Sequence, residues 1–322
     1  MIKQNDDMPK VSIIVPVYGV EKYIERCARS LFEQTLDDIE YLFIDDCTPD
    51  KSVEILKRVL EEYPHRKSQV VIHRMEQNSG QARVREWGMR NATGEYVIHC
   101  DSDDWVDVHM YEEMYNKAIE EDADVVVCGY KATDGVKVFK ECYHQQTNKA
   151  KLLSSLLILH ESWSVWNKMC KRSLYDSDIV YPTLAMGEDM VLTTQMVLNA
   201  QRIAVVNKAL YNYFYNPNSI TKVQSESSRY KHWKDSAENV KTVISIFKKK
   251  GLEHKYANEL EYLKFLQKEL AGDLARKKKY SKEWLEMFQE INLRTFSNPF
   301  ISNSRKLKFL VKLLYAEILN VI

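Results

Sequence analysis

The nine residues YVIHCDSDD, at positions 96–104, join a strand-like segment to a dense cluster of carboxylates. Residues 96–100 are mostly apolar on both faces, which is typical of a strand that helices cover on both sides of a parallel sheet. Three acids, Asp101, Asp103 and Asp104, follow within four residues. Because ligands bind beyond the carboxyl ends of the strands in such sheets, we expect the functional site at this strand end.

The segments around this stretch alternate between strand-like and helix-like patterns. Short apolar, β-branched runs predict strands at residues 11–15, 39–44, 70–72, 96–100 and 124–128. Apolar residues at helical spacing predict helices at residues 20–32, 53–60, 80–94 and 108–121. This alternation predicts an α/β fold with a mostly parallel, Rossmann-like central sheet and flanking helices.

The remainder of the chain is less regular. Its pattern predicts a hairpin near 136–143, helices at 150–160 and 189–200, and strands at 203–206 and 211–215. From about Ser225 the pattern is helical and charged to the end. We therefore expect one domain over residues 1–224 and a mostly helical C-terminal region over residues 225–322.

The charge of the chain is balanced overall but not along its length. The 322 residues contain 46 Lys and Arg and 46 Asp and Glu. Residues 226–322 hold 20 basic and 12 acidic side chains, a net charge of +8, so residues 1–225 carry a net −8. An acidic first part argues against nucleic-acid binding. A basic last part is suited to an anionic partner surface.

The cysteines and the N-terminus indicate the compartment. The six cysteines include no Cys-x-x-Cys pair, and several lie in apolar runs, as expected of reduced, buried thiols. The first residues are acidic and lack the apolar segment of a signal peptide. The sequence contains no run of about 18 apolar residues, so it predicts no membrane-spanning helix. We expect a cytoplasmic protein.

The acid cluster favours a divalent cation. Three carboxylates this close together repel one another, and Mg²⁺ or Mn²⁺ prefers carboxylate oxygens together with ligand phosphates. A calcium loop starting at Asp101 is excluded because Trp105 and Val106 stand where a ligand and a turn glycine are needed. The alternative that stays open is a solvated acidic turn or a cap for the following helix.

A family resemblance rests on ordered motifs between residues 11 and 221. The motifs are the opening strand with its Pro-x-Tyr turn at 11–18, Asp-Asp at 44–48, Asn-Ser-Gly through Arg85 and Gly88 at 78–88, the strand entry at 92–96, Asp-x-Asp at 101–104, Trp-Asn-Lys at 166–168 and Gly-Glu-Asp at 187–189. Together they resemble the inverting family-two glycosyltransferases with the GT-A fold. The resemblance implies a nucleotide-sugar-binding part at about 11–130 and an acceptor-side part at 131–224.

The resemblance also implies a role for each motif residue. The donor-binding residues would be Pro16, Tyr18, Asp46, Asn78, Arg85, Asp101 and Ser102, with Asp46 on the base and Asp101 on the ribose. Asp103 would bind a Mn²⁺ or Mg²⁺ ion that bridges the two phosphates. The acceptor or sugar side would hold Asp104, Trp166, Asn167, Lys168 and Glu188, with Asp104 placing either the sugar or the loop. Asp189 would be the general base.

The predicted function follows from these roles. The enzyme would move a sugar from a nucleotide-sugar, UDP-linked by expectation, to a hydroxyl of a glycan or lipid-linked acceptor in polysaccharide synthesis. The chain departs from the family pattern at Phe214, where an arginine is common. Lys222 or Lys208 is the hypothetical replacement on the diphosphate.

Two functions of other classes stay open. A nucleotidyltransferase that makes nucleotide-sugars would need a glycine-rich, basic phosphate loop, and residues 16–19 read Pro-Val-Tyr-Gly instead. A catalytically inactive carbohydrate-binding scaffold would have no need of the acids Asp103 and Asp189.

The C-terminal segment at residues 304–319 is amphipathic and basic. It is suited to lie on the anionic inner face of a membrane, near a lipid-linked acceptor. A helix that packs in the core or forms a homodimer fits the same pattern.

Overall fold

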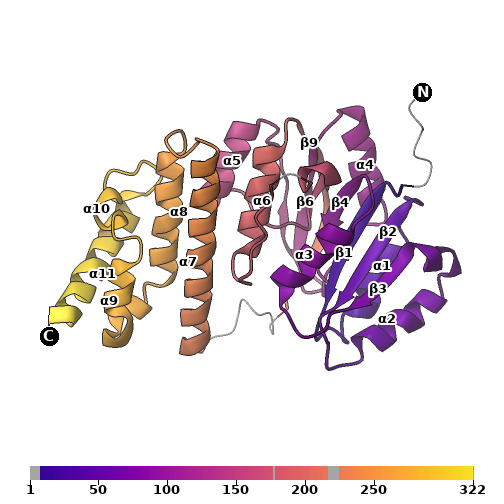
Figure 1. Ribbon diagram of the computed structural model, residues 1–322, viewed down its shortest axis with the longest axis horizontal. Helices are drawn as coiled ribbons and strands as arrows, with labels where there is room; N and C mark the ends of the chain where they lie inside the picture. The colour runs from indigo at the N-terminus through magenta and orange to yellow at the C-terminus, as the bar shows by residue number, and fades with distance from the viewer. Residues whose placement is uncertain (1–7, 177, 217–224, 322) are drawn as a thin grey trace. The chain divides into compact units, whose positions relative to one another are not determined.

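The computed structural model describes residues 8–176, 178–216 and 225–321 (Figure 1). It forms two compact units. The first unit contains Met1–Lys149, Ser164–Thr183 and Gln195–Pro217, and the second contains Ala150–Trp163, Leu184–Thr194 and Asn218–Ile322. This division differs from the predicted boundary at residue 224, since two stretches before it belong to the second unit.

The first unit is built on a nine-stranded sheet whose first part is parallel. Its strands run in the order β3 (Val70–Arg74), β2 (Ile39–Asp45), β1 (Val11–Val17) and β4 (Tyr96–His99). All three pairings among them are parallel. The predicted strand–helix alternation is therefore confirmed here, and the carboxyl ends of four strands lie at one edge.

The rest of the sheet is mixed. β8 (Lys168–Lys171) pairs antiparallel with both β4 and β6 (Val125–Thr133), and β6 pairs parallel with β9 (Ile203–Phe214). β5 (Trp105–Val106) lies antiparallel to β9 at the edge, and β7 (Val138–Cys142) forms a hairpin with β6. The strands predicted at 203–206 and 211–215 form one long strand, β9. Its pairing register with β6 shifts at Gly129.

Helices cover both faces of this sheet. They are α1 (Ile24–Phe32), α2 (Ser52–Glu61), α3 (Gln81–Asn91) and α4 (Met110–Glu120), with short 3-10 helices η1 (Pro64–Gln69) and η2 (Arg172–Leu174). Ile13 and Val15 of β1 share a buried core with α1, α2 and α4. Ile14 points the other way, and a Cβ atom on Gly88 would lie 2.5 Å from its side chain. α3 therefore packs on the opposite face from α1, at a distance that only glycine allows.

The second unit is helical. It contains α5 (Lys149–Leu157), the start of α6 (Glu188–Asn199), α7 (Glu226–Lys249), α8 (Ala257–Leu270), η4 (Leu274–Arg276), α9 (Lys278–Glu286), α10 (Ile291–Arg294) and α11 (Asn303–Val321). Asn239 of α7 donates hydrogen bonds to the carbonyls of Leu184 and Met186, and Ser154 of α5 donates to Glu259 of α8. These bonds place the stretches before residue 224 with the helices, which the sequence pattern did not predict.

A lysine lies in the core of this helical unit. Lys268 is fully buried, and its Nζ donates to the carbonyl of Leu285 at 3.0 Å and to Asn292 Oδ1 at 2.7 Å. The ammonium also lies 4.7 Å from the centre of the Trp284 ring. Burial lowers the pKa of Lys268 from 10.5 to about 7, with Glu290 partly opposing the shift.

The buried lysine predicts a pH-dependent stability. Between pH 7 and pH 9 the unfolded chain keeps a proton on Lys268 that the folded chain releases, so the free energy of unfolding rises with pH in this window. We expect the difference in unfolding free energy between the wild type and Lys268→Met to shift in favour of the wild type from pH 7 to pH 9. Urea unfolding of both proteins at each pH measures it, and a difference independent of pH would contradict the prediction.

Candidate active site

The loop after β4 holds the three acids in three different environments. Asp104 is buried, and its carboxylate accepts a hydrogen bond of 2.6 Å from the Tyr211 hydroxyl and one of 2.6 Å from the Phe214 N–H. The Tyr211 hydroxyl also accepts from the Asp101 N–H at 3.1 Å. Strand β9 therefore holds the acid loop in place from more than a hundred residues away.

Burial also decides the proton affinities of this loop. It raises the pKa of Asp104 well above the usual value, and the charges of Asp103 and Asp101 raise it further. The pKa of Asp103 is raised in the same way, while a 3.1 Å hydrogen bond from Asn216 Nδ2 opposes the shift. Asp104 is therefore held within the loop, which fits the predicted loop role, and its place on the sugar side stays a prediction.

Asp101 joins the loop to helix α3. Arg85 of α3 is buried, and its Nη2 donates to Asp101 Oδ1 at 2.6 Å, with Gln81 Nε2 at 3.3 Å from the same oxygen. The buried His99 lies two residues before Asp101, and neither of its ring nitrogens has a hydrogen-bond partner among the residues that the structure describes. Burial and the Arg85 charge lower the pKa of His99 well below its usual value, so the ring is neutral.

Asp46 follows strand β2 and holds the entry to α3. Its two carboxylate oxygens accept from the N–H groups of Ser79 at 2.7 Å and Gly80 at 2.9 Å, and Asn78 Nδ2 donates to its carbonyl at 3.2 Å. Gly80 has φ +80°, a conformation that suits glycine. Each oxygen keeps a second lone pair, so the predicted contact of Asp46 with a base stays a prediction.

The end of β1 lies beside these residues. Val17 pairs with Asp45, and its carbonyl accepts from the Asp46 N–H at 3.0 Å. Pro16 lies in this strand, and Tyr18, which follows it, exposes half of its side chain. The structure thus brings all the predicted donor-binding residues to one edge of the sheet, although the side chain of Ser102 is buried.

The Trp-Asn-Lys segment is buried in the first unit. Trp166 stacks on Tyr211, with ring centroids 4.2 Å apart, and is 7% exposed. Asn167 Nδ2 donates to the Cys128 carbonyl at 3.0 Å, and Lys168 Nζ donates to Asn167 Oδ1 at 2.9 Å. These three side chains hold the sheet together, because burying a tryptophan and satisfying its polar neighbours stabilises the fold. The acceptor role of this segment stays a prediction, and the burial of all three side chains argues against direct contact with an acceptor.

Glu188 and Asp189 belong to the second unit and open helix α6. Gly187 before them has φ +81°, which turns the chain into the helix. Glu188 is buried, whereas Asp189 is partly exposed and its Oδ1 accepts from the Met190 N–H at 2.8 Å. The structure describes the local setting of Asp189, and its role as general base stays a prediction.

The structure adds residues that sequence reasoning missed. Asn216 reaches Asp103, Tyr211 reaches Asp104, and Arg26 of α1 donates from Nη2 to the Asp103 carbonyl at 2.9 Å. The Tyr-rich pattern of the last strand was the available signal for Tyr211, while the other two contacts depend on tertiary structure alone.

Lys208 and Lys222 are the candidates to replace, on the diphosphate, the arginine that is common at the position of Phe214. Lys208 forms an ion pair of 2.9 Å with Glu113 of α4, which argues against a place on the diphosphate. Lys222 lies outside the described residues, as does the stretch around it. The Phe214 ring instead packs against Arg26, whose guanidinium lies 4.6 Å from the ring centre.

The site fits a divalent ion only with help from a ligand. Among the described residues, no group of three or more His, Cys, Asp or Glu side chains is arranged to hold a metal ion. Asp104 is buried and Asp101 is paired with Arg85, so Asp103 is the carboxylate suited to a metal. One carboxylate plus substrate phosphates is the usual donor set of Mg²⁺ sites in proteins, so the residues fit such an ion.

The comparison with protein families decides between the candidate classes. Residues 12–182 match the model of "Glycosyl transferase family 2", more than half of the chain. The chain belongs to glycosyl transferase family 2. This membership confirms the family predicted from the motifs, and it disfavours the nucleotidyltransferase alternative.

Relatives of this family-2 chain include two bacterial glycosyltransferases. It is 32% identical over 235 residues to the uncharacterized glycosyltransferase EpsJ of Bacillus subtilis, covering 70% of this chain and 67% of EpsJ. It is 30% identical over 211 residues to the poly(ribitol-phosphate) beta-N-acetylglucosaminyltransferase TarS of Staphylococcus aureus, covering 64% of this chain and 35% of TarS. The chain thus spans about a third of the length of TarS.

Solved structures show the same fold. TarS residues 1–349 with UDP-GlcNAc align with a TM-score of 0.71 at 20% identity, over 97% of this chain and 88% of that one. The mannosyltransferase PcManGT of Pyrobaculum calidifontis, solved with GDP-Man and Mn²⁺, aligns at 0.57 and 16% identity, over 99% and 88%. These likenesses confirm the GT-A fold of the family-2 chain.

The bond between Tyr211 and Asp104 gives a stability prediction. Tyr211→Phe leaves a buried carboxyl group without one donor, so we expect the free energy of unfolding to fall by about 1–3 kcal/mol. Urea unfolding measures the change. Tyr213→Phe on the same strand is the control, because its hydroxyl has no hydrogen bond in the described part of the chain. Equal effects of both changes would contradict the prediction.

Proposed function

We propose that this family-2 chain transfers a sugar from a UDP-linked donor to a hydroxyl of a cell-surface glycan or its lipid-linked precursor. The observation that carries this proposal is the meeting of three strand ends at one sheet edge, with Asp46, Asp101 and Asp103 held in place there. The printed names of TarS and its complex with UDP-GlcNAc support the donor and the acceptor class.

The proposed reaction is one displacement with inversion. An acceptor hydroxyl attacks the anomeric carbon, the bond from that carbon to the diphosphate oxygen breaks, and Asp189 takes the hydroxyl proton. A Mn²⁺ or Mg²⁺ ion held by Asp103 would supply stabilisation of the charge on the leaving diphosphate. The PcManGT structure with Mn²⁺ supports this choice of ion.

The residues of the chain divide the binding work in this proposal. Arg85 fixes the Asp101 carboxylate, which leaves the second oxygen of Asp101 for a ribose hydroxyl. Asn78 and Asp46 shape the turn before α3, beside the exposed ring of Tyr18. The base and ribose would thus be held before the reacting carbon is placed, as orientation requires.

A pair of variants tests the proposed function. A panel of UDP-sugars with Mn²⁺ first identifies the donor by UDP release. We expect Asp189→Asn to lower turnover about 100-fold or more with donor affinity kept, because only the proton acceptor is lost. We expect Asp103→Ala to weaken donor binding only when Mn²⁺ is present. Normal turnover of Asp189→Asn would remove the base assignment, and no turnover of any donor by the wild type would favour the inactive scaffold.

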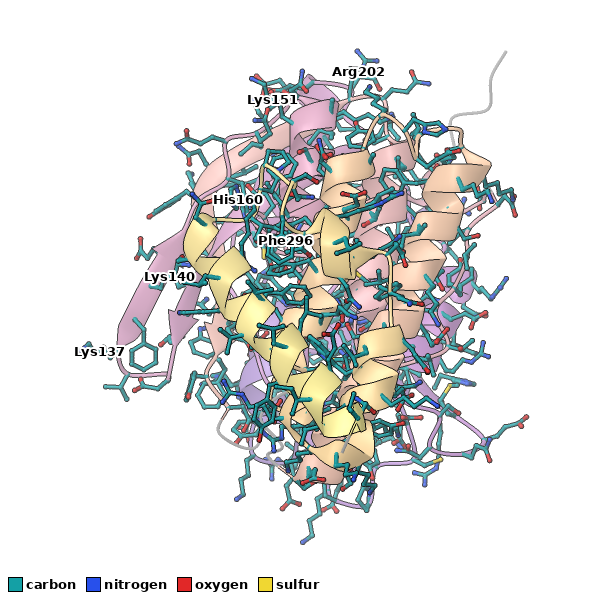
Figure 2. All side chains as sticks on the ribbon, turned by 90° about the vertical axis from the view of Figure 1, so that its left-hand side faces the viewer. Lys137, Lys140, Lys151, His160, Arg202 and Phe296 are labelled. Atoms are coloured by element: carbon teal, nitrogen blue, oxygen red, sulfur yellow. The ribbon has the colours of Figure 1, made fainter. Side chains whose placement is uncertain are left out.

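We also propose that helix α11 of the second unit lies on an anionic membrane face. One side of α11, with Phe309, Leu313 and Ala316, is buried. The opposite side exposes apolar side chains, namely Leu307, Val311, Leu314 and Ile318, each with more than half of its area accessible. Figure 2 shows α11 as a pale yellow ribbon near the viewer. In the described residues no helix is long and apolar enough to cross a bilayer.

The charge of α11 favours lipid over a second copy. The helix carries Lys306, Lys308 and Lys312 against a single acid, Glu317, while its Arg305 pairs with Glu269 of α8. Two such helices packed in parallel would bring like charges together, whereas an anionic lipid surface neutralises them. The apolar stripe between the basic residues would lie in the headgroup region.

Vesicle sedimentation of the full chain tests the membrane proposal. We expect binding to phosphatidylcholine vesicles that contain phosphatidylglycerol and much weaker binding to pure phosphatidylcholine. The double change Leu314→Glu and Ile318→Glu should abolish binding, whereas Leu293→Glu, at an exposed leucine of α10, should not. Equal binding of all variants would overturn the proposal, as would a dimer in solution that only the α11 changes dissociate.

A further inference from the structure

Arg26 of α1 contacts the acid loop from the face of the sheet opposite Arg85. Its Nη2 donates to the main-chain carbonyl of Asp103 at 2.9 Å. Its guanidinium lies 3.7 Å from the centre of the Trp105 ring and 4.6 Å from that of Phe214. One planar cation thus ties together α1, the turn that ends in β5, and the end of β9.

The shape of this contact requires arginine. The Trp105 and Phe214 rings are 6.3 Å apart at an angle of 52°, so the guanidinium covers both ring faces while a nitrogen still reaches the carbonyl. A lysine ammonium is a point donor and cannot cover two rings and bond the carbonyl in this way. The turn between β6 and β7 lies close to the guanidinium. A Cβ on Gly135, which has φ +93°, would lie 3.2 Å from Arg26 Nη1.

The hydrogen bond from Arg26 is made to Asp103, the residue proposed to bind the metal. It holds the carbonyl of Asp103, and with it the turn from Ser102 to Asp104, whose far end is fixed by Tyr211 and Phe214. The Asp103 carboxylate is held separately by Asn216. Without the Arg26 bond the main chain of Asp103 loses its tie to α1, so its side chain would no longer be directed by the turn.

We propose that Arg26 is a positioning residue that keeps Asp103 in the orientation in which it receives a divalent cation together with the donor diphosphate. The proposal deepens the proposed function and depends on it, since it takes Asp103 as the metal-binding carboxylate. Arg26 touches neither the metal nor the substrate in this proposal, and it acts through the main chain of Asp103 and through the Trp105–Phe214 pair.

The direction in which Mn²⁺ affinity changes after a substitution of Arg26 distinguishes a positioning effect from an electrostatic effect. Arg26→Met removes a positive charge beside Asp103 and Asp104, which by electrostatics alone would strengthen the binding of Mn²⁺. Loss of positioning would weaken it, because residues that orient a metal ligand typically contribute about 10- to 100-fold in affinity. If Arg26→Met binds Mn²⁺ more weakly, the cause is therefore the lost orientation of Asp103, because the lost charge would have the opposite effect.

The experiment measures Mn²⁺ binding to the full chain in the presence of UDP by the loss of the free-ion electron paramagnetic resonance signal. We expect Arg26→Met and Arg26→Lys both to raise the Mn²⁺ dissociation constant about 10-fold or more. Metal-free UDP binding, measured by calorimetry in chelator, should stay within about twofold of the wild type. Arg29→Met is the matched control, because Arg29 lies one turn along α1 and pairs with Glu25 and Glu62 on the surface.

Several results would overturn the proposal. Unchanged or tighter Mn²⁺ binding by Arg26→Met would show that the cation does not position Asp103. Full rescue by Arg26→Lys would show that a point donor suffices, and that the guanidinium on Trp105 and Phe214 does not position Asp103. A parallel fall in metal-free UDP binding and in unfolding temperature would make Arg26 a general packing residue. If the wild type binds UDP but no Mn²⁺, the metal role of Asp103 fails instead, and that result is distinct from an effect of Arg26.

Discussion

The buried carboxyl group of Asp104 is the interaction on which the site depends. A carboxyl group inside a protein is costly unless it is hydrogen-bonded, and here the Tyr211 hydroxyl and the Phe214 N–H both donate to it. Both donors come from β9, which β8 and β6 separate from β4 in the sheet and which pairs with β5 directly after the loop. The form of the loop after β4 therefore depends on the position of β9 as well as on the strand that the loop follows.

The same constraint separates the three neighbouring acids by role. Asp104 is buried and structural, Asp101 is paired with Arg85 on α3, and Asp103 is left half-buried with Asn216 beside it. Identical side chains within four residues thus differ because each faces another element.

The sequence predicted the local part of this arrangement and missed the long-range part. The parallel strands and the placement of Asp46, Arg85 and Asp101 follow from apolar periodicity and from motifs that span a few residues. The burial of Trp166 and the antiparallel strand β8 could not be predicted, because they depend on partners far away in the chain. The same holds for the stretches that pack with the helical unit, since the local pattern of α5 and α6 gives no information on their neighbours.

The charge of the acid loop argues that cation and donor bind together. Arg85 and Arg26 reach the loop from opposite faces of the sheet, and burial with neighbouring charge favours the neutral form of Asp104. The loop therefore has little net charge of its own with which to attract a free divalent ion, and the described residues offer it no preformed group of three ligands. In the proposed function, a diphosphate would bring the missing oxygens and negative charge, and the cation would offset the repulsion between that diphosphate and Asp103. Each ligand would thus supply what the other lacks, and the coupling between their binding would be reciprocal.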